Sequence, residues 1–126
     1  MVASQVDSYR KLVRDRIPEI IRGAGDLPVC DRIADDADYI AGLIDKAYEE
    51  LAELREARGA ERVNELADVF EVLSALIDTM GSSLVDVAEA AARKRAERGG
   101  FNDRVWLEKV VRNTQQGDWR RLEERL

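Results

Sequence analysis

Residues 64–78 read NELADVFEVLSALID, and apolar side chains recur in this stretch every three or four positions. This spacing is typical of an amphipathic helix, in which successive residues are about 100° apart. The predicted core stripe is Leu66, Val69, Leu73, Leu76 and Met80, and the predicted polar stripe is Asn64, Glu71, Ser74 and Asp78. Glu65 and Asp68 belong to neither stripe. Their row continues as Val72, Ala75 and Thr79, so this acidic pair begins a face that is otherwise interior.

The preceding segment carries a second acidic pair beside its apolar residues. Its predicted core stripe is Ile40, Leu43, Ile44, Ala47, Leu51 and Leu54, and its predicted solvent-facing stripe is Asp38, Gly42, Asp45, Glu49 and Glu56. Glu50 and Glu53 lie next to the core stripe, on a row that they share with Lys46. Eleven residues separate Glu53 from Glu65, which favours a tight antiparallel hairpin whose two acidic pairs face each other.

Four converging carboxylates would repel one another strongly unless they are protonated or neutralised, because burial and like charge both disfavour their ionised forms, and a divalent cation would neutralise them. Magnesium takes hard oxygen ligands and keeps several waters, so a site without histidine suits Mg²⁺ or Mn²⁺. The two acidic pairs therefore predict a metal centre at this point of the hairpin. The same pattern leaves Glu49, Glu56, Glu71 and Asp78 as solvated surface residues.

Capping residues and glycines mark four helices along the chain. The expected helices span residues 17–22, residues 35 or 36 to 58, residues 61–80 and residues 84–98, followed by Gly23, Gly59, Gly81 and Gly99. Residues 27–33 are expected to form an extended connection or an edge strand, residues 105–107 a short extended piece, and residues 119–126 a polar terminal helix. The sequence therefore predicts an all-α fold with one domain, residues 1–110, and a C-terminal tail, residues 111–126.

The composition excludes several classes of protein. The 126 residues include no histidine, so neither a Ser-His-Asp triad nor a histidine-rich zinc site is possible. Cys30 is the single cysteine, which fits a reducing compartment. No apolar run reaches transmembrane length and the first residues lack the apolar core of a signal peptide, so we expect no membrane contact and a cytoplasmic location. The net charge of −6 argues against a nucleic-acid polymer as partner.

The acidic pairs also resemble a known signature. Residues 49–53, EELAE, and residues 65–68, ELAD, are similar to the EExxE and ExxD motifs of the MazG-like all-α nucleoside triphosphate pyrophosphohydrolases. Residues 9–21, YRKLVRDRIPEII, and residues 94–101, KRAERGGF, resemble the branch of predicted house-cleaning pyrophosphatases that act on noncanonical nucleotides. Together these blocks are spread over most of the chain.

The resemblance implies a magnesium-dependent enzyme that cleaves a nucleoside triphosphate between its α and β phosphates, giving a nucleoside monophosphate and pyrophosphate. It implies as metal ligands Glu50, Glu53, Glu65 and Asp68, and as catalytic residues Glu49, Glu50 and Glu53. Glu49 would bind a second metal or orient the attacking water. The family assembles an active-site four-helix bundle in a homodimer or tetramer. Self-association is also expected because apolar residues cover most of the circumference of the helix at residues 61–80.

The substrate phosphates need cationic partners, which neutralise the charge on the departing pyrophosphate. The candidate substrate-binding residues are Lys11, Arg14, Arg16, Lys94 and Arg98. Leu12, Val13 and Ile17 are expected to anchor the basic stretch that contains the first three. The alternative for each cation is ordinary surface charge or, for the last two, a favourable place near a helix C-terminus.

Two alternative functions share parts of this pattern. A phosphoribosyl-ATP pyrophosphohydrolase, or an enzyme similar to a dUTPase or dCTPase, would use the same metal chemistry, and the sequence shows no base-binding pocket that separates them. The alternative from another class is a non-catalytic helical interaction module whose acidic pairs only solvate a bundle. Metal response and nucleotide turnover discriminate between the enzyme and the module.

Overall fold

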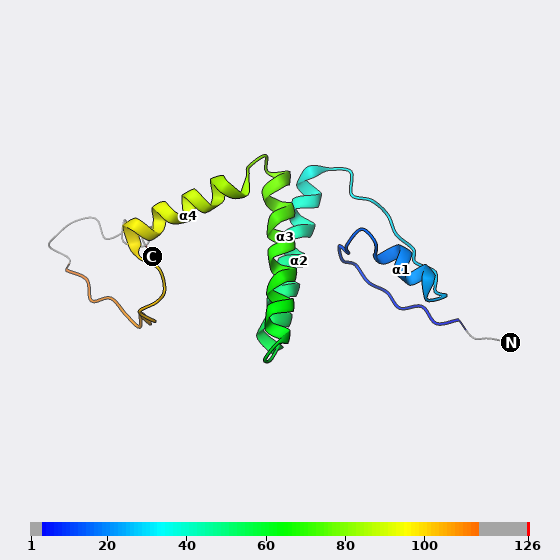
Figure 1. Cartoon of the computed structure of the whole chain (residues 1–126), viewed down its shortest axis with the longest axis horizontal. Coiled ribbons are helices and arrows are strands. Elements are labelled where there is room, and N and C mark those ends of the chain that lie inside the picture. The colour runs from blue at the N-terminus through cyan, green and yellow to red at the C-terminus, as the bar shows by residue number, and fades with distance from the viewer. Residues whose placement is uncertain (1–3, 114–125) are drawn as a thin grey trace. The chain divides into compact units, whose positions relative to one another are not determined.

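The computed structural model describes residues 4–113 and residue 126. These residues form four α-helices without any strand, namely α1 (Ile17–Gly23), α2 (Asp36–Glu56), α3 (Glu61–Thr79) and α4 (Leu84–Arg98), drawn in Figure 1. The expected all-α fold is therefore confirmed for this part of the chain. Among the described residues, no helix combines the length and apolar character needed to cross a bilayer.

The chain divides by its packing into two compact units, Met1–Leu84 and Val85–Leu126. The first unit contains α1, α2 and α3, and the second contains almost all of α4. The expected domain of residues 1–110 and its C-terminal tail stay a prediction. The terminal helix expected at residues 119–126 falls almost entirely outside the described residues.

Local capping signals explain the ends of α2. The Asp35 side chain accepts a hydrogen bond from the backbone N–H of Ala37, so Asp35 is the N-cap that satisfies one otherwise free donor. Ala57 has an extended backbone, which ends the helix two residues earlier than expected. Gly59 then adopts a φ of +58°, a left-handed conformation that costs little for glycine. The chain can therefore reverse within a few residues and begin α3.

The hairpin of α2 and α3 is the packed part of the first unit, and Figure 1 shows the two helices side by side. Its buried apolar residues are Leu43 and Ala57 from α2 and its C-cap, and Val69 and Val72 from α3. The short connection makes the helices antiparallel, so the end of α2 lies beside the start of α3. This arrangement brings the two acidic pairs to the same end of the hairpin.

The predicted core stripes are partly wrong, because the buried face of each helix is rotated relative to them. Leu51 of α2 is 47% exposed, and Leu66 and Met80 of α3 are 56% and 65% exposed. The row that contains Glu65 and Asp68 faces α2 instead, as its buried member Val72 shows. Within the described part of the chain, α2 and α3 pack mainly against each other, and each covers only part of the other's wide apolar arc.

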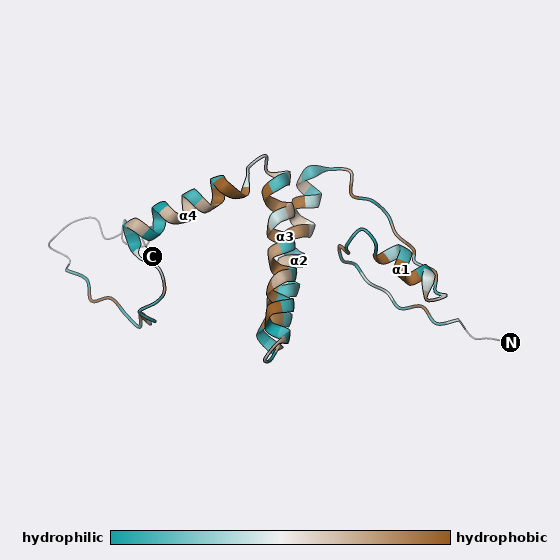
Figure 2. Cartoon of the chain, viewed as in Figure 1, coloured by the Kyte–Doolittle hydropathy of each residue, from teal (hydrophilic) through white to brown (hydrophobic). Residues whose placement is uncertain are grey.

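The remaining described segments are irregular or are helices outside this hairpin. Residues 27–33 form no regular element, which agrees with an extended connection and makes the edge-strand alternative wrong. Residues 105–107 are exposed and are not assigned to a strand. In α4 the apolar side chains gather in the first turns, where Leu84, Val85 and Val87 are exposed (Figure 2).

Candidate metal centre

Carboxylates from both helices of the hairpin form two overlapping groups. Glu50, Glu65 and Asp68 each offer an oxygen atom, and the three atoms lie within 4.8 Å of one another. The same limit holds for the oxygens of Glu49, Glu50 and Glu53. Glu50 belongs to both groups, so it joins the acidic pair of α2 to that of α3. The structure thus brings together all four residues that the resemblance implies as metal ligands.

Glu50 is the most buried carboxylate of the described residues, since only 7% of its surface is exposed. Its Oε2 atom and the Oε2 atom of Glu65 are buried without a hydrogen-bond partner in the described part of the chain. Buried carboxylate oxygens are normally paired, because desolvation without a partner is unfavourable. These two oxygens are therefore candidate ligand atoms for a cation.

Cationic side chains partly balance the cluster. Lys46 Nζ lies 3.2 Å from Glu49 Oε2 and 3.2 Å from Glu50 Oε1. The basic stretch contributes the other two contacts, from Lys11 Nζ to Glu49 Oε1 at 3.1 Å and from Arg14 Nη2 to Asp68 Oδ1 at 2.6 Å. Three cations thus contact a cluster of five carboxylates, so an excess of negative charge remains.

The protonation equilibria reflect these contacts. Burial raises the pKa of Glu50, and the neighbouring Glu53 carboxylate raises it further, although Lys46 opposes both effects. Burial would also raise the pKa of Glu49, but hydrogen bonds from Lys11 and Lys46 outweigh it and leave that pKa below its usual value. Burial would lower the pKa of Lys46, whereas its bonds with Glu49 and Glu50 raise it overall.

Two details of the cluster differ from the sequence-based interpretation. Glu49 was expected on a solvent-facing stripe, yet its side chain is only 29% exposed and is held by two lysines. Lys46 was not expected to have a role, although it lies three and four positions before Glu49 and Glu50. That spacing places the three side chains on neighbouring helical rows and was the signal that could have identified the lysine.

The candidate substrate-binding cations fall into three sets. Lys11 and Arg14 reach the cluster, while Leu12 and Val13 between them are half-buried, as the anchoring role predicts. Arg16 instead pairs with Glu19 at the start of α1, at 3.2 Å. Lys94 and Arg98 lie one turn apart on α4, in the second unit.

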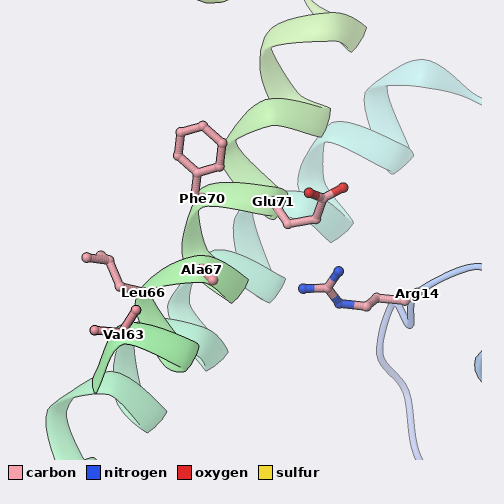
Figure 3. A pocket seen from close by; sticks show the side chains of 6 residues that line it. All are labelled: Arg14, Val63, Leu66, Ala67, Phe70 and Glu71. Carbon is pink, nitrogen blue, oxygen red and sulfur yellow. The ribbon is translucent and has the colours of Figure 1, made fainter. Parts of the chain in front are cut away.

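A shallow hollow borders the cluster on the outer side of α3. It has a volume of about 510 Å³ and is lined by Arg14, Val63, Leu66, Ala67, Phe70 and Glu71 (Figure 3). The guanidinium of Arg14 points toward α3, beside Ala67 and Glu71, and also binds Asp68. The hollow and the cluster therefore share Arg14. This hollow could not be predicted from the sequence, because it depends on where the basic stretch lies against α3.

Comparison with known proteins gives one partial match. An uncharacterized protein of Mycolicibacterium smegmatis is 55% identical over 47 residues, which are 37% of this chain and 47% of that protein. The chain thus spans about half the length of the curated relative that it matches. No family model matches the chain, and no solved structure matches it.

Proposed function

We propose that this chain is a metal-dependent nucleoside triphosphate pyrophosphohydrolase, which cleaves the bond between the α and β phosphates and releases a nucleoside monophosphate and pyrophosphate. The observation that carries the proposal is the buried, unpartnered Oε2 atom of Glu50 within a carboxylate cluster from two helices. The similarity of residues 49–53 and 65–68 to the EExxE and ExxD motifs supports the reaction class.

The donor set fits a hard divalent cation. Every candidate ligand is a carboxylate oxygen, and the chain has no histidine, which favours Mg²⁺ or Mn²⁺ over softer metals. Glu50, Glu53, Glu65 and Asp68 would hold the metal. When bound, it supplies Lewis-acid polarisation of the phosphoryl oxygens.

Glu49 would position the attacking water by accepting a hydrogen bond from it. The lowered pKa keeps this carboxylate ionised at neutral pH but also makes it a weak base. Orientation of water therefore suits Glu49 better than proton abstraction. Lys11 and Arg14 already lie at the cluster and would bind the phosphates, whereas Arg16, Lys94 and Arg98 stay proposed as further phosphate contacts.

An exposed apolar surface supports assembly as at least a homodimer, with a tetramer as the larger possibility. Its members are Ile44, Tyr48 and Leu51 on α2, Leu66 and Leu73 on α3, and Met80 at the C-cap of α3. A second hairpin packed on this surface would form a MazG-like four-helix bundle and would bury apolar area that the monomer leaves in water.

House-cleaning hydrolysis of noncanonical nucleotides is the proposed role, because residues 9–21 and 94–101 resemble that branch of the family. Phosphoribosyl-ATP hydrolysis and dUTPase-like or dCTPase-like activity are the alternatives within the same chemistry. A screen of turnover against canonical and modified nucleotides ranks these substrates. A non-catalytic interaction module would show no turnover with any of them.

Thermal unfolding with and without Mg²⁺ tests the metal centre directly. A cation that binds only the folded protein raises its melting temperature. We expect Mg²⁺ to stabilise the wild-type protein, and we expect Glu53→Gln and Asp68→Asn to lose both this effect and nucleotide turnover. Glu56→Gln is the matched control, because Glu56 is an exposed residue of α2 outside the cluster. Unchanged activity in both cluster variants would contradict the proposal.

A further inference from the structure

The basic strap, which we define as residues 11–16, reaches the candidate metal centre at two points. Lys11 binds Glu49 across 38 positions of sequence, and Arg14 binds Asp68 across 54 positions. The Arg14 contact is the shorter of the two, at 2.6 Å. Neither contact is dictated by local helix geometry, so both depend on how the strap lies against the hairpin.

The strap holds its cations against the same carboxylates that would bind a metal. Asp68 shares its place in the cluster with Glu50 and Glu65, and the Asp68 oxygen Oδ1 accepts the hydrogen bond from Arg14. Mg²⁺ retains several waters when it binds a protein, so it needs free space around its ligands. The Arg14 guanidinium, 2.6 Å from Asp68, fills part of that space, and its positive charge repels a metal cation.

The ion pair between Arg14 and Asp68 is also one that a competing cation could replace. The side chains of Arg14 and Asp68 are 56% and 37% exposed, and ion pairs in such surroundings are weak. The carboxylates of the cluster are all carried by α2 and α3, so none of them belongs to the strap. Arg16, the last cation of the strap, is bound to Glu19 and takes no part in the cluster.

We infer that the basic strap acts as a built-in counter-cation of the candidate metal centre and that Arg14 and a divalent cation are alternative partners of Asp68. With a cation bound at Asp68, Arg14 would lose this carboxylate as its partner, while Leu12 and Val13, which are half-buried, would keep the strap near the hairpin. The guanidinium would then be available to an anionic phosphate group. This inference rests on the proposed metal centre. It adds the Arg14–Asp68 ion pair as a contact that competes with the divalent cation for Asp68.

Affinity for Mn²⁺ alone, measured by the electron paramagnetic resonance signal of the free ion, tests the competition. Arg14→Met removes the competitor and is expected to increase Mn²⁺ affinity about fivefold, the factor that an exposed ion pair can contribute. Arg16→Met removes the same charge from the same strap but leaves the cluster contacts intact, so its affinity should match the wild type. Equal or weaker binding by Arg14→Met would overturn the inference.

Hydrogen exchange of the strap backbone provides a second readout that needs no substrate. With Mn²⁺ present, amides of residues 11–16 should exchange faster than in the metal-free protein. Asp68→Asn should show fast exchange without metal and no further change on its addition, because the partner of Arg14 is already weakened. Slower exchange on metal addition would show that the strap is part of the metal-bound structure and would overturn the inference.

The two proposals fail in different ways. If wild-type protein binds Mn²⁺ but its strap exchange does not change, the strap inference is wrong and the metal centre stands. If neither the wild type nor Arg14→Met binds Mn²⁺, the metal centre is wrong and the strap inference fails with it.

Discussion

Glu50 is a buried carboxylate that lies among other carboxylates and is a proposed metal ligand. Its side chain is nearly inaccessible, and it belongs to both groups of carboxylates in the cluster. One of its oxygens has no hydrogen-bond partner in the described structure. Burial and the neighbouring Glu53 raise its pKa, so the ionised form is less favourable in the folded protein than in the unfolded chain. In the metal-free protein, Glu50 therefore reduces stability at neutral pH.

We predict that Glu50→Gln raises the melting temperature of the metal-free protein at pH 7. The gain should disappear as the pH falls through the folded-state pKa of Glu50, because the wild-type carboxyl group is then protonated as well. Circular dichroism melts of both proteins in a chelator, over a pH series, measure the difference. A lower melting temperature for the variant at pH 7 would contradict this account of Glu50.

Glu49→Gln is the matched comparison and should have the opposite sign. Its lowered pKa means that the carboxylate stabilises the folded protein above its unfolded-state pKa, and this contribution is lost as the pH falls through its folded-state pKa. The variant should therefore melt below the wild type at pH 7, with the two melting temperatures converging in acid. Identical melts at neutral pH would show that the contacts with Lys11 and Lys46 contribute nothing to stability.

At the scale of elements, the connection between α2 and α3 sets the register of the cluster. Gly59 has a φ of +58°, and a Cβ atom added there would point into open space. Gly59→Ala should therefore destabilise the protein through backbone strain alone, by about 1 kcal/mol. Urea denaturation measures the free energy of unfolding. Gly23→Ala, in α1 with equally open surroundings but no positive φ, should show no such loss.

The ends of the helices could be predicted from sequence because their signals are local. Asp35, Gly59 and Gly81 act within one turn of the ends that they mark, and the expected bounds of α4 match those observed. The i,i+3 spacing of each acidic pair was equally visible. The side of each apolar arc that becomes buried was not visible, because it depends on the neighbouring helix: Leu51 and Leu66 were expected in the core and are exposed. The strap contacts were also unpredictable, since they join residues far apart in sequence.

At the scale of the whole molecule, the hairpin leaves large apolar side chains exposed on both of its helices. Leu66, Leu73 and Met80 recur every seven residues along α3 and are all exposed, so they form a continuous row. Ile44 and Leu51 repeat this spacing on α2. Such rows are typical of a helix-bundle interface.

We predict that Leu66→Glu shifts the protein from dimer to monomer in sedimentation velocity experiments, because it places a charge in the apolar row. Val29→Glu is the control, since Val29 is 92% exposed on the connection before α2 and lies outside this surface. Helical circular dichroism confirms that both variants are folded. A wild type that sediments as a monomer at high concentration would refute the predicted assembly.

The central claim is that the carboxylate cluster hydrolyses nucleoside triphosphates with a divalent cation. Release of pyrophosphate from a panel of canonical and modified nucleotides, measured with Mg²⁺, with Mn²⁺ and with a chelator, tests it most directly. We expect release that requires the metal, forms a nucleoside monophosphate in equal amount, and disappears in Glu53→Gln. Release that persists in the chelator or in Glu53→Gln, or no release from any nucleotide, would contradict the claim.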